Sequence, residues 1–184
     1  MDIKIEKIES LNEENISTLK NILSSQRWDF HSSPIVTSDK ILDNINSGYY
    51  LNKDIVTFLI KSGEEYIGVM RLFDLGDDWE DDETPMFDIR ILNSYRKKGV
   101  GEYSLKFLTD FVFNTYPNKW RFEGTTRADN IAMRKLFEKC GFVKEAHYRQ
   151  AWPDESGKKY DCTGYGILRS DWENNEITVV RFNS

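Results

Sequence analysis

The sequence predicts a mixed α/β or α+β fold, and two observations support this class. Segments typical of strands, with alternating or β-branched apolar residues, are interspersed with segments that repeat apolar residues at helical spacing. Their order is β-α-α-β-β-β-α-β-α-β-β, without internal repeats, low-complexity tracts or linkers. Because 184 residues is the length of one ordinary domain, we expect residues 1–184 to form a single domain.

The first half of the chain predicts one strand, two helices and three further strands. Residues 3–8 (IKIEKI) alternate apolar and charged side chains as a half-buried strand does, and helical spacing follows at residues 11–25 and 38–48. Residues 55–75 are two β-branched strands joined at the turn SGEE, and residues 85–92 (PMFDIRIL) are a third.

The segment between the two helices is turn-rich and aromatic. It carries Trp28, Phe30 and His31 within QRWDFHSSP. Aromatic side chains in such a segment either anchor it to the core or line a cleft, and the sequence leaves both roles open.

The second half predicts a turn, two helices and three strands. The turn YRKKGVGEYS occupies residues 95–104. The last two strands are expected to pair in antiparallel fashion across the turn PDESG. The remaining elements are expected at residues 105–116 (helix), 119–126 (strand), 129–141 (helix), 142–152 (strand) and 158–168 (strand).

Composition and charge exclude several classes of protein. The net charge of -6 argues against a general nucleic-acid binder, which needs surplus cations for phosphates. No apolar run reaches the roughly 18 residues of a membrane span, and the first ten residues lack the apolar core of a signal peptide. Cys140 and Cys162 have no metal-ligand spacing, so we expect a reduced, cytoplasmic protein without a metal or a membrane partner.

Three interpretations compete for the cationic, glycine-containing turn. The first is a solvated basic turn. The second is a nucleotide site. A Walker loop is excluded because Glu102 and Tyr103 follow Gly101. A dinucleotide fingerprint would place Ser104 at the position of its third glycine and Glu123 at the position of the acid that binds the ribose. The third is a pyrophosphate held by the unpaired N–H groups and the positive dipole end of a helix N-terminus.

Two motifs in order favour the third interpretation. The turn contains R-x-x-G-x-G as Arg96-Lys97-Lys98-Gly99-Val100-Gly101, and a later segment runs from Asn130 through a helix to Gly141-Phe142. Together they resemble the GNAT superfamily of acyl-CoA-dependent N-acetyltransferases. The closing segment GKKYDCTGYGILRSDW resembles the branch that includes the ribosomal-protein N-terminal acetyltransferases.

The resemblance implies a fold and a cosubstrate site. The fold is a mixed, mostly antiparallel sheet that splays between the strands at residues 85–92 and 119–126, flanked by about four helices. Acetyl-CoA would place its diphosphate on the cationic turn and its pantetheine arm along the first of these strands. The residues implied to bind it are Ile91, Leu92, Arg96, Lys97, Lys98, Gly99, Val100, Gly101, Asn130 and Phe137.

The resemblance also frames the catalytic residues. Relatives often carry a carboxylate base on the strand before the turn, where this chain offers Asp88; the alternative for Asp88 is an ion pair with Arg90. Glu123 on the neighbouring strand is the next candidate base. Phe137 stands where relatives have a tyrosine that protonates the thiolate, which leaves that proton transfer without an assigned donor.

The function predicted is acetyl transfer from acetyl-CoA to a primary amine, of a small molecule or of a protein N-terminus. The alternatives are a non-catalytic acyl-CoA-binding or sensing protein and, more remotely, a dinucleotide oxidoreductase. The acidic loop at residues 74–83 would attract a cationic acceptor or serve only as solvated surface. The oligomeric state stays open between a monomer and a homodimer.

Overall fold

The computed structural model describes residues 2–76 and 84–181, so most of the acidic loop predicted at residues 74–83 lies outside the described residues. The predicted fold class is confirmed: helices accompany strands whose recorded pairings are antiparallel. The chain forms two compact units, an N-terminal unit (Met1–Ser104) and a C-terminal unit (Leu105–Ser184). Helix α3 (Val100–Thr115) contributes to both.

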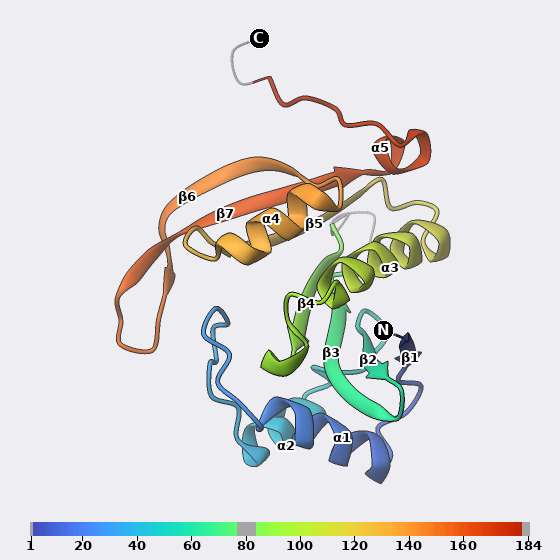
Figure 1. The fold of residues 1–184 in the computed structure, drawn as a ribbon, viewed down its shortest axis with the longest axis vertical. Coiled ribbons are helices and arrows are strands. Elements are labelled where there is room, and N and C mark those ends of the chain that lie inside the picture. Colours follow the sequence, from blue (N-terminus) through green and yellow to red (C-terminus); the bar gives the residue numbers. More distant parts are fainter. Residues whose placement is uncertain (1, 77–83, 182–184) are drawn as a thin grey trace. The chain divides into compact units, whose positions relative to one another are not determined.

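The N-terminal unit is built on a four-stranded antiparallel sheet of order β1-β2-β3-β4 (Figure 1). The strands span Ile3–Lys7 (β1), Val56–Ser62 (β2), Glu65–Phe73 (β3) and Met86–Ile91 (β4). Gly68 allows β3 and β4 to approach, because a Cβ there would lie 2.5 Å from the Arg90 carbonyl oxygen. Because β4 is the last strand in this order, its side opposite β3 is an edge of the sheet.

Helices α1 (Glu13–Leu23) and α2 (Ser38–Asn46) pack on this sheet (Figure 1). The Asn12 side chain caps α1 by accepting the N–H of Asn15 at 2.9 Å, and Thr37 caps α2 in the same way. Leu19, Ile22 and Leu23 of α1 lie at helical spacing and are buried in the core shared with the sheet. With Trp28, which is fully buried, they form the core of the unit.

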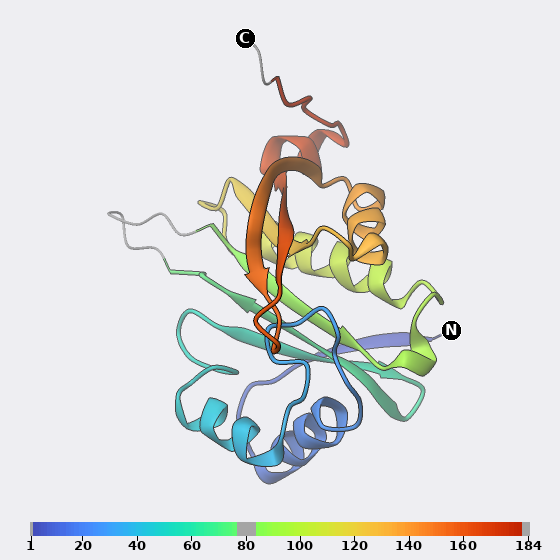
Figure 2. The same cartoon turned by 90° about the vertical axis from the view of Figure 1, so that its left-hand side faces the viewer.

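The C-terminal unit holds a second antiparallel sheet of order β5-β7-β6. Its strands are β5 (Arg121–Arg127), β6 (Val143–Pro153) and β7 (Lys159–Leu168), of which β6 and β7 form a long ribbon (Figure 2). Helix α4 (Ile131–Lys139) precedes β6, and α5 (Arg169–Asn174) follows β7. Phe137 of α4, Phe122 of β5 and Tyr165 of β7 are buried in this unit.

Two details of the predicted fold are refined. The strands between which a splay was expected, β4 and β5, belong to separate sheets and each is the last strand of its sheet. Over residues 2–76 and 84–181 there are five α-helices and the 3-10 turn η1 (Asn93–Tyr95), against about four helices expected. The additional helix is α5.

Candidate functional site

The glycine turn connects β4 to α3 within the N-terminal unit. After η1, Lys97 and Gly99 both have positive φ, 60° and 84°, and α3 begins at the buried Val100. A Cβ on Gly99 would meet no atom within 4 Å, so the space beside this backbone is open. Glycine suits the position for both reasons: it adopts positive φ without strain and lets a ligand approach the backbone.

Three cations accompany this turn. The Arg96 Nε donates to the Ile91 carbonyl oxygen at 3.0 Å, and the guanidinium lies 5.8 Å from the ring centroid of Trp28. Lys97 and Lys98 are exposed, and the Lys98 amine lies 5.4 Å from the Tyr95 ring. Backbone N–H groups at the start of α3, its positive dipole end and these side chains together favour an anion.

The end of β4 offers one residue for backbone pairing. The Leu92 N–H is already bonded to the Ile67 carbonyl oxygen of β3 at 2.9 Å. Because successive residues of a strand direct their backbone groups to opposite edges, Ile91 presents its N–H to the edge that β3 does not occupy, together with its carbonyl oxygen, which also accepts from Arg96. Of the two residues predicted to pair with a pantetheine arm, Ile91 is the better placed.

Asp88 lies in the middle of β4 and is held by two basic side chains. Its Oδ1 is 3.1 Å from His31 Nδ1, and its Oδ2 accepts from Arg90 Nε at 3.1 Å. Burial raises the pKa of the Asp88 carboxyl, but the charges and hydrogen bonds of His31 and Arg90 outweigh it and hold the pKa well below its usual range. The carboxylate is therefore ionised and weakly basic.

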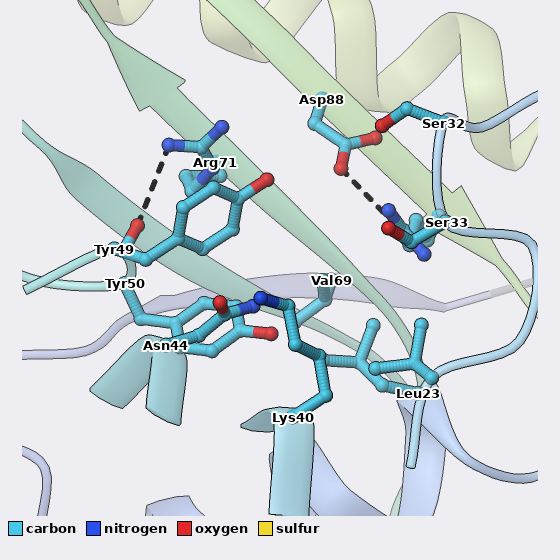
Figure 3. Close-up of a pocket in the computed structure, with 12 residues that line it drawn as sticks. Leu23, Ser32, Ser33, Lys40, Asn44, Tyr49, Tyr50, Val69, Arg71 and Asp88 are labelled. Atoms are coloured by element: carbon cyan, nitrogen blue, oxygen red, sulfur yellow. Dashed lines mark hydrogen bonds and ion pairs between the residues drawn. The ribbon is translucent and has the colours of Figure 1, made fainter. Parts of the chain in front are cut away.

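A cavity of about 290 Å³ opens beside Asp88, entirely within the N-terminal unit (Figure 3). Residues from α1, α2, β3, β4 and the segments after α1 and α2 line it. They are Leu23, Ser32, Ser33, Val36, Lys40, Asn44, Tyr49, Tyr50, Val69, Arg71, Asp88 and Arg90.

Two arginines in this cavity are buried, with 9% of Arg71 and 8% of Arg90 exposed. Arg71 is fixed between aromatic rings, 3.7 Å from the Tyr49 centroid and 4.3 Å from that of Phe73. Its Nη1 donates to the Tyr49 carbonyl oxygen at 3.4 Å (Figure 3). The Nε of Arg71 and the Nη1 of Arg90 are buried and have no hydrogen-bond partner.

Sequence reasoning identified Asp88 and its pairing with Arg90 but not the cavity. Of the two roles expected for the loop aromatics, Trp28 takes the first: it anchors the loop in the core, with its Nε1 donating to the Leu23 carbonyl oxygen at 2.8 Å. His31 contacts Asp88, but the residues that line the cavity include none of the three aromatics. The sequence held one signal for Arg71. It is a lone cation within the apolar run VMRLF of a central strand, and a buried arginine usually has a binding partner.

Glu123 lies on β5 in the C-terminal unit, in an arginine-centred cluster. Arg121 binds Glu123 through its Nη2 at 2.9 Å and also pairs with Glu145. The hydrogen bond of Glu145 raises the pKa of the Arg121 guanidinium, with Glu123 adding to the effect. Glu123 is thus a carboxylate already engaged by a permanent cation.

Asn130 and Phe137 belong to α4. The Asn130 Oδ1 accepts the Met133 N–H at 3.3 Å, which confirms its role as N-cap, and its Nδ2 donates to Thr126 Oγ1 at 3.0 Å. Phe137 is fully buried, stacked on Tyr165 at a centroid distance of 4.6 Å and tilted against Phe142 at 5.3 Å.

Within residues 2–76 and 84–181, no group of three or more His, Cys, Asp or Glu side chains is placed to hold a metal ion. No helix in the described part of the chain combines the length and apolar character needed to cross a membrane.

Comparison with known proteins places the chain in a family. The model of the acetyltransferase (GNAT) domain matches residues 10–143. The spermidine N-acetyltransferase of Vibrio cholerae, solved with CoA and spermine, has a TM-score of 0.74 at 19% identity, covering 94% of this chain and 98% of that one. A chimera of the Vibrio cholerae enzyme with hSSAT has a TM-score of 0.77 at 19% identity, covering 95% of this chain and 99% of that one.

A dodecameric structure of the Vibrio cholerae enzyme has a TM-score of 0.74 at 18% identity, covering 94% of this chain and 97% of that one. No curated protein sequence matches significantly. At these identities the structural likeness establishes the fold alone. The domain match, however, spans more than half of the chain, and the protein therefore belongs to the GNAT acetyltransferase family.

Proposed function

We propose that this protein transfers an acetyl group from acetyl-CoA to the primary amine of a small molecule or protein N-terminus, with residues 1–184 acting as one domain. The observation that carries the proposal is the turn from Arg96 to Gly101. It combines three cations, open space beside Gly99 and the first N–H groups of α3. That chemistry suits the diphosphate of CoA.

The remaining cosubstrate contacts follow from the family resemblance. The pantetheine amides would pair with the backbone of Ile91 as an added strand does. Asn130 and Phe137 stand at family positions near the arm, although the side chain of Asn130 already caps α4. Such an enzyme would work in the cytoplasm, where acetyl-CoA is available and the two cysteines of this chain stay reduced.

The reaction requires two protons to leave the acceptor nitrogen. An ammonium group with a pKa near 10 must lose the first before its lone pair can attack the thioester carbonyl carbon. The C–N bond forms, the C–S bond breaks and the nitrogen gives up its second proton as the amide forms. One proton ends on the CoA thiol and the other passes to solvent.

Asp88 and Glu123 are the two candidate bases. Each is bound to an arginine, and the depressed pKa of Asp88 reduces its strength as a proton acceptor. Loss of the true base should lower the rate of acetyl transfer by roughly 10²- to 10⁴-fold with little change in acetyl-CoA affinity. Asp88→Asn and Glu123→Gln, compared in one assay, therefore separate the two assignments.

Phe137 has no proton to give to the thiolate. We propose that the thiolate leaves unassisted or takes its proton from water or a tyrosine. The candidate tyrosines are Tyr103 and Tyr148, which are 47% and 52% exposed. The CoA thiolate is a tolerable leaving group, so the enzyme would be slowed but active.

Two similarities, one of structure and one of sequence, bear on the class of acceptor. The structural neighbours are named for spermidine acetylation, whereas the closing segment resembles the ribosomal-protein branch, whose acceptors are protein N-termini. Both are primary amines, which is the common element of the proposal.

Calorimetric titration with acetyl-CoA tests the cosubstrate site. Gly101 is the second residue of α3, so Gly101→Asp adds bulk and negative charge where a diphosphate would bind. An acidic residue in the first turn favours a helix, so this variant should fold. We expect its affinity for acetyl-CoA to fall at least about tenfold. Gly63→Asp, which adds the same charge to the β2–β3 turn, should bind normally, and equal binding by both variants would refute this placement.

A further inference from the structure

The cavity beside Asp88 has a chemistry that neither a polyamine nor a plain amine explains. We propose that it binds the carboxylate of the acceptor, so that the acceptor is a small amino carboxylate. The role of the bound molecule as an acceptor rests on the proposed acetyl transfer. The binding of a carboxylate in this cavity can be tested without turnover.

Unpartnered donors are the first observation. Arg71 and Arg90 both line the cavity, and Arg71 Nε and Arg90 Nη1 are buried and have no hydrogen-bond partner. Buried N–H groups are almost always bonded, and leaving one on a charged side chain without an acceptor is costly. Two such groups, on two arginines that line the same cavity, point to an acceptor that arrives with a ligand.

The arginines are also fixed in place. Arg71 lies between the rings of Tyr49 and Phe73 and is bonded to a backbone carbonyl, while Arg90 is bonded to Asp88 and faces Trp28 at 5.6 Å. A guanidinium that is already ordered loses little entropy when a carboxylate binds. Its planar donors match the two oxygens of a carboxylate.

Charge balance favours an anion over a polyamine. Arg71 and Arg90 line the cavity, and the exposed Lys40 of α2 adds a third cation. Among the lining residues that the structure describes, Asp88 is the one acidic residue, and its oxygens are bound by His31 and Arg90. The other polar lining groups are the hydroxyls and amide of Ser32, Ser33, Tyr49, Tyr50 and Asn44. A polycation would meet net repulsion here, whereas a carboxylate would be attracted.

The size of the cavity sets the size of the ligand. A volume of about 290 Å³ lies at the lower limit of the roughly 300–1,000 Å³ typical of small-molecule sites. Leu23, Val36 and Val69 supply an apolar wall beside the polar groups. The space therefore suits a molecule of amino-acid size with a short aliphatic or aromatic part.

The position on β4 connects this cavity to the proposed chemistry. Arg90 directly precedes Ile91, whose backbone is the proposed partner of the pantetheine arm, and neighbouring residues of a strand are about 3.3 Å apart. A carboxylate held at Arg90 would thus bind beside the strand residue that is the proposed partner of the pantetheine arm.

Matched pairs of amines test the inference directly. Lysine and cadaverine, ornithine and putrescine, and tyrosine and tyramine differ only in a carboxylate, and binding of each to the full chain with CoA can be measured by calorimetry. We expect at least one acid to bind at least about tenfold more tightly than its partner, as a charge-assisted bond to arginine predicts. Arg71→Gln should abolish that preference.

Two further variants guard against a folding defect. Lys40→Gln, at an exposed lining residue, should fold normally and weaken the preference by a smaller factor. Lys4→Gln removes one exposed charge from β1, at the other edge of the sheet, and should leave the preference intact. Phosphoethanolamine beside β-alanine distinguishes a phosphate from a carboxylate, and tighter binding of the phosphate would contradict the class proposed.

Several outcomes overturn the inference. The first is equal or tighter binding of the decarboxylated amines. The second is an unchanged preference for the acid both in Lys40→Gln and in an Arg71→Gln variant that is folded. The third is no binding of any acid at millimolar concentration. Failure of acetyl transfer with all amines, while acids still bind through Arg71, would instead contradict the proposed function and leave the anion site standing.

Discussion

Replacing Asp88 by asparagine removes the negative charge that, among the described lining residues, opposes the cations of the cavity. The Asp88 side chain is 20% exposed and the Arg90 side chain 10%, so both partners are mostly withdrawn from water. Asparagine keeps the shape and one acceptor oxygen but not the negative charge. Asp88→Asn therefore leaves Arg90 and its neighbours as uncompensated positive charges.

The expected cost follows from this geometry. Removing one partner of a fully buried ion pair costs roughly 3–5 kcal/mol. Asp88 has partners at 3.1 Å on both oxygens but retains some contact with water, and the asparagine oxygen still accepts a hydrogen bond. We therefore expect Asp88→Asn to lower the free energy of unfolding by about 2–3 kcal/mol at neutral pH, below the full value for a buried pair.

The pH dependence has a definite sign. The pKa of Asp88 in the folded protein lies below its value in the unfolded chain, about 3.9. Its contribution to stability is thus fully present above that value and is lost as the pH falls through the folded pKa. The difference in unfolding free energy between the wild type and Asp88→Asn should be largest above about pH 5 and shrink below about pH 4.

Urea unfolding between pH 3 and pH 7 measures both effects. Asp43→Asn, at an exposed position of α2, is the matched control and should change the free energy of unfolding by no more than about 0.5 kcal/mol. Equal stability of Asp88→Asn and the wild type across this range would refute the account of Asp88 as an ion-paired carboxylate. A difference that grew towards low pH would refute the direction of its pKa.

Two further predictions concern α4. Phe137→Ala should lower the free energy of unfolding by roughly 3–5 kcal/mol because the ring is fully buried against Tyr165 and Phe142; Phe137→Leu should keep most acetyl transfer, and a folded, acetyl-CoA-binding Phe137→Leu without turnover would reveal a catalytic role for the ring. Asn130→Ala should cost about 1 kcal/mol through the lost cap, and Asn130→Ser less; equal losses in urea unfolding would contradict the capping role.

The order of elements was predictable because it depends on local patterns. Apolar periodicity and turn residues predicted each strand of the described residues and four of their α-helices, since each pattern indicates which face of an element is buried. The start of α3 was predicted at residue 105 but lies at Val100. The prediction was too late because the glycines at the start of the helix are also typical of a turn. The cap at Asn130 was likewise readable from the sequence.

The cavity was not predictable because distant contacts create it. His31 meets Asp88 from 57 positions away in the chain, and Arg71 is fixed by Tyr49 from a different element. Helix α5 depends on tertiary contacts in the same way. Its first residue, Arg169, donates to the carbonyl oxygens of Phe113, Tyr116 and Lys119, and a six-residue helix has little stability of its own.

Release of free CoA thiol from acetyl-CoA in the presence of an amine panel tests the central claim most directly. The panel should hold the paired amines above, spermidine and peptides with free N-termini, and each reaction should be compared with acetyl-CoA alone. We predict thiol release that depends on an amine, matches the acetylated product in amount and is fastest with an amino carboxylate. Binding of acetyl-CoA without amine-dependent release from any member would contradict acetyl transfer and favour a non-catalytic acyl-CoA-binding protein.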